Sequence, residues 1–423
     1  MRDVASSSFE EALTSRRSGL GFAICCRLID EFLFTRPTSQ SLCLIYTTRD
    51  EKKSNDTLDR LQQHLNVHTK KRKTALNNRI SFEPQQLDLT SLLSVRSLSE
   101  KLITSIPKLD AIVLNAGYGG FTGLNWPKAV WGVLTDFPFE VTYPTYKLSG
   151  VGYTTAPQLS RQPATAEKPP PPLGQVFCSN LFGHYCLAHR LVPLHSTPPG
   201  EGRIIWISSV EAYAHTFSVD DIQGLSSSTA YESSKRLTDI LALTSSLPST
   251  RRYVQRFVST PLQQPETQVA LPNIYLTHPG ICTTGIIPLH WIPYYFMMFA
   301  FYLARWLGSP WHTVSSYKGA CAPVWLALAS QEELDALEER DGKGKWGSCV
   351  DWRGEERVMR TEVEGWGFGG KVGDGQKGGM RKGRRRGVEG LREGERETFE
   401  ELGRRCWEEM EGLREEWERR LRG

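Results

Sequence analysis

Residues 203–209 read Arg-Ile-Ile-Trp-Ile-Ser-Ser, an apolar run rich in β-branched side chains that ends in two serines. Such a run predicts a strand buried on both faces, as in a parallel sheet. Three further runs share this character: Leu42–Tyr46, Ala111–Leu114 and Ile274–Thr277. Segments with apolar residues at helical spacing lie between them: Gly21–Phe34, Ser91–Ile106, Leu181–Leu194 and Tyr231–Leu247. The alternation predicts an α/β fold with a doubly wound parallel sheet.

Length, charge and cysteine content set broad limits. The 423 residues are enough for one large domain with appendages or for two ordinary domains. The net charge of +4 gives no reason to expect a nucleic-acid partner. The nine cysteines lack the paired CxxC units of a zinc site, so we expect reduced thiols, a cytosol-facing protein and no metal. Residues Met1–Arg17 lack the apolar core of a secretory signal, and no export is expected.

Composition divides the chain into three parts. We expect an atypical N-terminal segment over residues 1–17, a nucleotide-binding and catalytic domain over 18–330, and a charged, largely disordered tail over 331–423. The tail ends in a predicted helix over 389–422, where apolar residues recur at helical spacing among Glu and Arg. Within the central domain, the Pro-rich residues 153–172 predict an exposed loop or lid.

Residues 286–307 are strongly apolar and aromatic. Their number approaches the roughly 20 residues that cross a bilayer, but Pro288, His290, Pro293 and Arg305 argue against a span. The Trp and Tyr content favours a membrane interface, and the alternative is a helix buried beside a substrate pocket. We expect this segment to face the membrane surface.

Tyr231 and Lys235 lie four residues apart, on one face of a predicted helix. The Lys235 ammonium is expected to lower the pKa of the Tyr231 phenol and so allow proton transfer to a carbonyl oxygen near neutral pH. A Tyr–Lys pair at this spacing is common by chance. Ser208 and Ser209, at the end of the 203–207 strand, add hydroxyls that can hold a substrate oxygen beside Tyr231, although serines there are otherwise ordinary turn residues.

Two further elements complete a pattern. Asn115-Ala116-Gly117 follows the strand Ala111–Leu114, and Asn180 lies in Ser-Asn-Leu-Phe-Gly-His. In order and approximate spacing, the set resembles the short-chain dehydrogenase/reductase family, which implies a Rossmann-like fold. The resemblance implies the catalytic residues Asn180, Ser209, Tyr231 and Lys235, and the cofactor-binding residues Asn115, Ala116, Gly117, Tyr231 and Lys235.

Other cofactor contacts rest on shorter signals. Asp88 resembles the family aspartate near the adenine ring, and Pro279, Gly280 and Thr284 resemble the loop that meets the nicotinamide carboxamide. Arg49 follows the first predicted strand, where a carboxylate would bind an unphosphorylated ribose. A guanidinium suits a 2′-phosphate, so we expect NADPH rather than NADH, although an arginine after a strand is often just solvated.

The start of the family pattern is incomplete. Gly19, Leu20 and Gly21 keep the second half of a TGxxxGxG loop and are predicted to contact the cofactor pyrophosphate. Thr14 and Ser15 stand where Thr-Gly is expected, and Met1–Leu13 contains no four-residue apolar run for a central strand. We therefore expect the first strand and part of the glycine loop to be missing from the sheet.

A closer similarity, over approximately Gly19–Ala329, is to the fungal 3-keto-sterol reductases. It is carried by Trp131–Pro138, Thr142–Lys147, Val176–Tyr185 and Ile204–Ser209. It implies NADPH-dependent reduction of a 3-oxo-sterol to the 3β-hydroxy-sterol in the C-4 demethylation of ergosterol biosynthesis. It also implies a location on the cytosolic face of the endoplasmic reticulum membrane or on lipid droplets, and the sterol C-4 demethylation enzymes and a membrane tether as partners.

Two alternatives stay open. A short-chain reductase of another lipid or polyketide ketone would keep the catalytic residues and change the pocket lined by residues 121–146. A catalytically dead scaffold of the sterol demethylation complex would fit the broken glycine loop and the charged terminal helix, and an absence of NADPH binding would support it.

Overall fold

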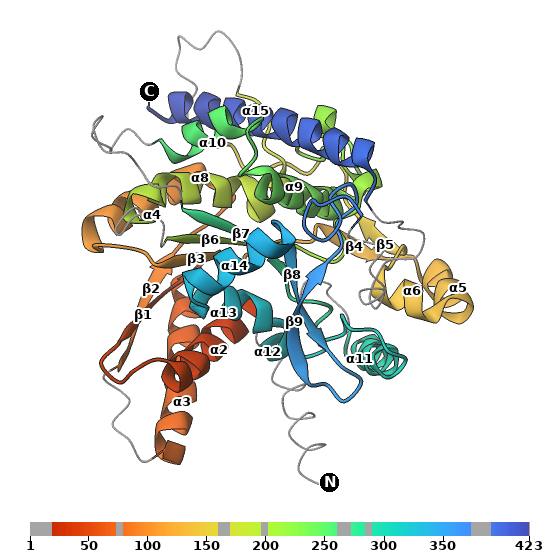
Figure 1. Cartoon of the computed structure of the whole chain (residues 1–423), viewed down its shortest axis with the longest axis horizontal. Helices are drawn as coiled ribbons and strands as arrows, with labels where there is room; N and C mark the ends of the chain where they lie inside the picture. Colours follow the sequence, from red (N-terminus) through yellow and green to blue (C-terminus); the bar gives the residue numbers. More distant parts are fainter. Residues whose placement is uncertain are drawn as a thin grey trace.

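The computed structural model describes residues 19–72, 79–159, 170–195, 202–259, 272–283, 290–373 and 391–422. Helices pack on both faces of a largely parallel sheet, as the sequence predicts (Figure 1). The strands are β1 (Leu42–Thr48), β2 (Ile80–Gln86), β3 (Ala111–Leu114), β4 (Phe121–Leu124), β5 (Lys147–Ser149), β6 (Arg203–Ile207), β7 (Asn273–His278), β8 (Lys345–Val350) and β9 (Glu356–Thr361).

The longer helices are α2 (Leu20–Thr35), α3 (Glu51–Arg72), α4 (Leu92–Ser105), α5 (Trp126–Thr135), α6 (Phe137–Thr142), α8 (Gly183–Leu191), α9 (Ala230–Thr244), α10 (Arg251–Val258), α11 (Trp291–Trp306), α13 (Cys321–Leu328), α14 (Gln331–Asp341) and α15 (Glu393–Arg422). Shorter helical elements are α7 (Gln175–Phe177), a π-helical turn η2 (Cys178–Phe182), α12 (Ser316–Gly319) and the 3₁₀ turns η3 (Val192–His195), η4 (Ala214–Thr216) and η5 (Val219–Asp221). The four predicted strands and four predicted helices are all present, with small differences in their bounds.

The described strands form three separate sheets, one of which is the antiparallel pair β4–β5. The main sheet has the order β3-β6-β7-β8-β9, in which only the β8–β9 pairing is antiparallel. β1 and β2 form a parallel pair of their own. A Rossmann-like sheet places its first strand between the second and the fourth. Among the described residues no strand pairs with both β1 and β3, which is the position that the first strand of a Rossmann-like sheet takes. Met1–Leu13 lie outside these residues.

The core follows from the alternation of side chains along β6. Ile204 and Trp206 pack into the hydrophobic cluster formed with α4, α8 and α9. Ile205 and Ile207 face the other way, toward clusters that include residues of α2 and α13. All five β6 residues are buried. A strand covered on both faces needs apolar residues at successive positions, which is why its sequence reads as a continuous apolar run.

The prediction of a largely disordered tail after residue 330 is wrong for most of that segment. β8 pairs in parallel with β7 inside the main sheet, and all six of its residues are buried. α15 lies along α9 and α10 (Figure 1) and buries Phe399, Cys406, Trp407 and Met410. The helix predicted over 389–422 is therefore present, but as part of the core. The tract 374–390 lies outside the described residues.

Charge pairing explains why this segment packs although its composition is highly charged. Glu411 is fully buried; it accepts a hydrogen bond from the Tyr185 hydroxyl at 2.6 Å and pairs with Arg414 at 2.7 Å. Arg414 also pairs with Glu418 at 2.8 Å. A buried charge is tolerated when it is paired and hydrogen-bonded. Composition alone cannot separate such paired charges from solvated ones.

Two segments singled out in the sequence have mixed outcomes. Of the Pro-rich insertion, residues 153–159 and 170–172 are described and several are exposed, whereas 160–169 lie outside. Of the apolar segment, residues 290–307 are described and contain α11, while 286–289 lie outside. Among the described helices, none combines the length and apolar character needed to cross a bilayer. All nine cysteines are free thiols, and the described residues contain no cluster that could hold a metal ion.

Trp407→Ala tests whether α15 belongs to the folded core. The side chain is 2% exposed and contacts the rings of Tyr185 and Phe257. Its truncation is expected to lower the free energy of unfolding by about 3–5 kcal/mol, measured by urea titration. Glu409→Ala, an exposed change on the same helix, is the control and should have little effect. Equal stability of both variants would contradict the packing.

Candidate active site

The predicted catalytic residues meet at the carboxyl ends of three neighbouring strands. Asn115 follows β3, Ser209 follows β6 and Pro279 follows β7. Tyr231 stands in the first turn of α9 and Lys235 one turn later. Because β3, β6 and β7 are parallel neighbours, their carboxyl ends lie at one edge of the sheet, the edge where open α/β sheets bind ligands.

Tyr231 and Ser209 lie close to each other. The Ser209 side chain acts to lower the pKa of the Tyr231 phenol, and its hydroxyl accepts a hydrogen bond from the backbone N–H of Glu211 at 3.2 Å. Tyr231 is 9% exposed, and Phe121 of β4 packs against it with 5.5 Å between ring centres. Lys235 is buried and donates to the carbonyl of Ile207 at 2.8 Å. Two hydroxyls therefore stand together in a poorly hydrated place, with an ammonium 5.8 Å from the Tyr231 ring centre.

The expected effect of Lys235 on Tyr231 is wrong. The pKa of Tyr231 is raised, first by burial and then by the charge of Glu211, while Lys147 and the nearby Ser209 side chain act in the opposite direction. Burial lowers the pKa of Lys235 to about 8, against the favourable charge of Asp239. Desolvation disfavours the charged form of each group, and here it outweighs their attraction. Tyr231 consequently keeps its proton across neutral pH.

Asn180 connects two parts of the site. It lies in the π-helical turn η2 and is 2% exposed. Its Oδ1 accepts from the backbone N–H of Tyr118 at 2.6 Å, and its Nδ2 donates to the Tyr118 carbonyl at 3.1 Å and the Ser234 hydroxyl at 3.0 Å. The loop after β3 is thus tied to the helix that carries Tyr231. π-helical turns occur frequently at functional sites.

Some of the residues predicted to bind the cofactor lie at the same carboxyl edge of the sheet. Gly19 precedes α2, and Leu20 and Gly21 begin it. A Cβ at Gly21 would come within 2.8 Å of Asn115 Nδ2, so the absence of a side chain there lets the start of α2 approach the Asn115–Gly117 loop. Ala116 and Gly117 are exposed, as surface for a ligand must be.

The remaining predicted contacts have separate outcomes. Arg49 follows β1 and is exposed. The Asp88 carboxylate accepts from the backbone N–H and the hydroxyl of Thr90, at 2.9 and 2.7 Å, and so holds the turn before α4. Gly280 has φ +70° and donates to His278 Nδ1 at 3.0 Å, a conformation that favours glycine. Thr284 lies outside the described residues.

Sequence reasoning missed a buried ion pair beneath the site. Lys345 of β8 pairs with Asp239 of α9 at 2.6 Å and donates to the Ser209 carbonyl at 2.6 Å. Ser208 donates to the other oxygen of Asp239, so it supports the site and does not face it. Asp239 lies one turn after Lys235, which is a signal in the sequence. Lys345 gave none, because it was assigned to the tail.

A second missed group flanks Tyr231. Lys147 of β5 donates to Glu211, two residues after Ser209, at 2.8 Å, and also to Glu232, the neighbour of Tyr231. The side chains of Lys147 and Glu232 are 5% and 6% exposed. Neither contact was visible in the sequence, since Lys147 lies 64 residues before Glu211 and 85 before Glu232 along the chain.

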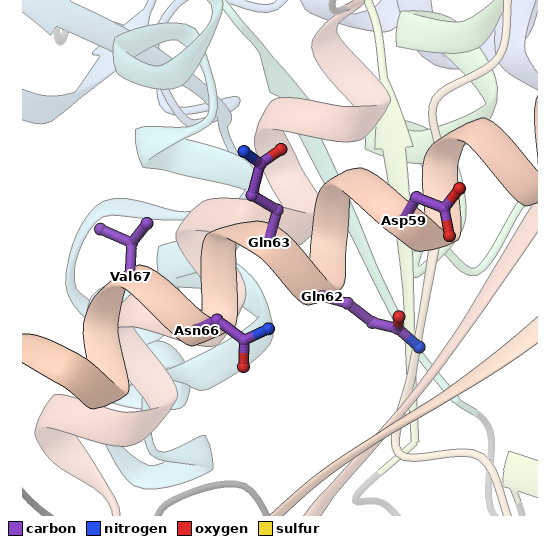
Figure 2. A pocket seen from close by; sticks show the side chains of 5 residues that line it. All are labelled: Asp59, Gln62, Gln63, Asn66 and Val67. Atoms are coloured by element: carbon purple, nitrogen blue, oxygen red, sulfur yellow. The ribbon is translucent and has the colours of Figure 1, made fainter.

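The surface also has a hollow that none of the predicted site residues lines. It is formed along α3 by five residues of that one helix: Asp59, Gln62, Gln63, Asn66 and Val67 (Figure 2). None of them is a predicted site residue. Most of them are polar amides or acids on a solvent-facing helix, so we assign the hollow no function.

Comparison with known proteins finds relatives that match this chain over most of its length. No family model matches it. The 3-keto-steroid reductase of Aspergillus fumigatus is 50% identical over 426 residues, which cover 97% of this chain and 94% of the relative. That of Gibberella zeae is 38% identical over 451 residues, covering 96% and 93%. That of Schizosaccharomyces pombe is 32% identical over 358 residues, covering 83% and 90%.

The extent of this likeness corrects one expectation. The residues after Arg340 make up about a fifth of the chain, so a match over 97% of it must run well into them. The prediction that the resemblance ends near Ala329 is therefore wrong. The C-terminal segment belongs to the region shared with the Aspergillus relative, in agreement with its place in the sheet.

Replacing Lys345 tests the ion pair beneath the site. Lys345→Met leaves Asp239 buried without its cation and is expected to lower the free energy of unfolding by about 3–5 kcal/mol in urea titrations. The double variant Lys345→Met/Asp239→Asn should recover part of that loss, because no uncompensated charge remains. Arg340→Met removes one partner of an exposed pair and serves as control. An unchanged stability in Lys345→Met would refute the role of the pair.

Proposed function

Since the chain belongs to the family of fungal 3-keto-steroid reductases, we propose that it reduces the 3-oxo group of a sterol to the 3β-hydroxyl group, with NADPH as the reductant, in sterol biosynthesis. The observation that carries this proposal is the closeness of Ser209, which follows β6, to Tyr231 in the first turn of α9, with the Lys235 ammonium 5.8 Å from the Tyr231 ring centre. These residues belong to a family pattern that also includes Asn115 and Asn180.

The residues at the edge of the sheet fit a dinucleotide. The N-terminus of α2, at Gly19–Gly21, offers backbone N–H groups of the kind that bind phosphate. The space that a Cβ at Gly21 would fill lies against Asn115. Arg49, exposed after β1, suits the 2′-phosphate that distinguishes NADPH from NADH. When bound, NADPH supplies a hydride to the carbon of the ketone.

The protein residues would handle the proton. Ser209 donates a hydrogen bond to the ketone oxygen and holds it beside Tyr231. As C3 accepts the hydride, Tyr231 gives its proton to that oxygen, and the resulting phenolate recovers a proton from solvent. Lys235 and Asn180 support this proton path. A raised pKa suits the reductive direction, because the reaction must begin with Tyr231 protonated.

An apolar surface beside the site supports contact with a membrane. α5 exposes Trp131 and Leu134, at 71% and 78%, and α11 exposes Phe296 and Phe299, at 71% and 60%. α6 packs between them and contacts both helices, and the three lie together at one side of the molecule (Figure 1). Exposed apolar patches of this kind mark interaction sites, and a sterol substrate is dissolved in the bilayer. The sequence predicted the α11 part alone.

We further propose a location on the cytosolic face of the endoplasmic reticulum membrane or on lipid droplets. There the enzyme would work beside the sterol C-4 demethylation enzymes and their membrane tether. These partners follow from the family resemblance, and the apolar surface of α5 and α11 is compatible with a membrane-bound setting.

Tyr231→Phe tests the assigned acid. The change removes the hydroxyl that donates the proton and keeps the ring that packs on Phe121. Turnover of a 3-oxo-sterol should fall by about 10²–10⁴-fold, whereas NADPH binding, followed by nicotinamide fluorescence, should persist. Tyr253→Phe, at a buried tyrosine of α10, is the matched control. Full activity of Tyr231→Phe would exclude Tyr231 as the acid.

Flotation with liposomes tests the membrane surface. The wild-type protein should float with liposomes of neutral phospholipid and sterol, and Trp131→Glu/Phe296→Glu should remain in the soluble fraction because charges replace apolar contacts. Phe34→Glu, an exposed change on α2, should float like the wild type. A wild-type protein that does not float would contradict the proposed membrane contact, but it would not bear on the proposed reduction of the 3-oxo group.

A further inference from the structure

Three charged side chains, two of them buried and one partly buried, lie beside Tyr231 without a role in the mechanism above. They come from separate parts of the chain: Lys147 from β5, Glu211 from the loop after β6, and Glu232 from α9. Lys147 donates to both carboxylates, to Glu211 at 2.8 Å and to Glu232 over a short contact. The Lys147, Glu211 and Glu232 side chains are 5%, 15% and 6% exposed. We refer to them as the Lys147 triad.

The triad is close enough to act on Tyr231. Lys147 Nζ lies 5.5 Å from the centre of the Tyr231 ring, compared with 5.8 Å for Lys235 Nζ. It also lies 4.7 Å from the centre of the Phe121 ring, which in turn packs on Tyr231. β4 and β5 pair with each other, so Phe121 and Lys147 fix this hairpin on α9 from its two strands.

The charges of the triad have opposite effects on the phenol. Lys147 favours the phenolate, and Glu211 and Glu232 oppose it. With all three ionised, the triad carries one net negative charge. Without Lys147 it would carry two, held in a poorly hydrated place where charge interactions are strong. The Lys147 ammonium therefore reduces the net negative charge that lies near Tyr231 when Tyr231 loses its proton.

Other charged groups near Tyr231 do not replace Lys147. α9 carries two other cations: Lys235, whose charge is favoured by the nearby Asp239 and opposed by Lys345, and Arg236, which donates to the carbonyl of Glu364. Tyr146, the neighbour of Lys147, also feels Glu211 and Lys147 and has a raised pKa, chiefly from burial. The groups that face the phenol are thus Glu211 from the loop after β6, Glu232 and Lys235 from α9, and Lys147 from β5.

We propose that Lys147 is a positioning residue for the reduction: held by Glu211 and Glu232, its ammonium fastens the β4–β5 hairpin to α9 and stabilises the negative charge that forms on Tyr231 as the proton passes to the substrate. The proposal rests on the proposed function, because it presumes that Tyr231 is the proton donor. The β4–β5 hairpin would then contribute a charge to the proton transfer and also shape the site.

Two variants should move the pH dependence in opposite directions. Reduction needs protonated Tyr231, so kcat falls as pH rises through its pKa. Lys147→Met leaves Glu211 and Glu232 uncompensated, raises that pKa and lowers kcat near neutral pH by about tenfold or more. Glu211→Gln removes one negative charge, and the alkaline decline of kcat should move down by on the order of 1–3 pH units. The measurement is kcat for a 3-oxo-sterol over about pH 6–11.

A double variant and a control separate charge from structure. Lys147→Met/Glu211→Gln restores the wild-type net charge of the triad and should regain most of the kcat lost in Lys147→Met. Lys128→Met, at an exposed lysine of α5 in the same hairpin insertion, should change neither kcat nor its pH profile. If Lys147→Met does not fold, the downward shift in Glu211→Gln still decides the question.

The anchoring role has a readout that needs no turnover. In the protein without cofactor, the amides of residues 121–124 and 147–149 should exchange hydrogen faster in Lys147→Met. In Glu211→Gln they should exchange as in the wild type, because the contact with Glu232 remains. Unshifted pH profiles with unchanged exchange, in an active wild-type protein, would overturn the role of Lys147 alone. A wild-type protein that reduces no 3-oxo-sterol would refute the proposed function, and the proposal would fall with it.

Discussion

Parallel strands of one sheet end at the same edge, and β3, β6 and β7 bring three distant loops together there because of that constraint. Ser209 is at the edge because β6 ends at Ile207, and Asn115 because β3 ends at Leu114. α9 then crosses the sheet beside these ends with Tyr231 and Lys235 in its first two turns. The Lys345–Asp239 pair ties the helix to β8 and to the Ser209 backbone, so the edge and the helix form one rigid frame.

The electrostatics of the site follow from its burial. Desolvation keeps Tyr231 protonated and lowers the pKa of Lys235 to about 8. A proton donor that must be ready before hydride arrives gains from such an environment, whereas an oxidation that begins with a phenolate would be disfavoured. The Lys147 triad extends the same reasoning to charges outside the family pattern. The hairpin that carries Lys147 also carries α5 and α6, so the α5 part of the apolar surface belongs to an element that contacts Glu232 of α9, the neighbour of Tyr231.

Sequence reasoning succeeded where local pattern decides structure. The run Arg203–Ile207 is buried on both faces, and β6 has these bounds; the helical spacing in Ser91–Ile106 and Tyr231–Leu247 likewise marks α4 and α9. β2 was missed because it contains Pro84 and several polar residues, which weaken the strand pattern. The absence of a first strand is predicted from the lack of an apolar run in Met1–Leu13; these residues lie outside the described part of the chain, so this stays a prediction.

The failures concern contacts between distant residues. β8 and α15 were assigned to a disordered tail because their surroundings are rich in Glu, Arg and Gly, although Glu411 and Arg414 are in fact buried as a pair. Nothing in the sequence indicated that Lys147 and Lys345 form ion pairs, because only the fold brings each to its carboxylate partner. The predicted effect of Lys235 on Tyr231 was wrong for a related reason, since helical spacing gives proximity and says nothing about desolvation.

The most direct test of the central claim follows hydride and proton separately. The purified protein would be incubated with NADPH deuterated at the transferable nicotinamide position and with a 3-oxo-sterol in lipid vesicles, and the product would be analysed by mass spectrometry. The account predicts a 3β-hydroxy-sterol with one deuterium at C3 and an exchangeable hydroxyl proton. An unchanged ketone under conditions where NADPH binds, or a product without deuterium at C3, would contradict it.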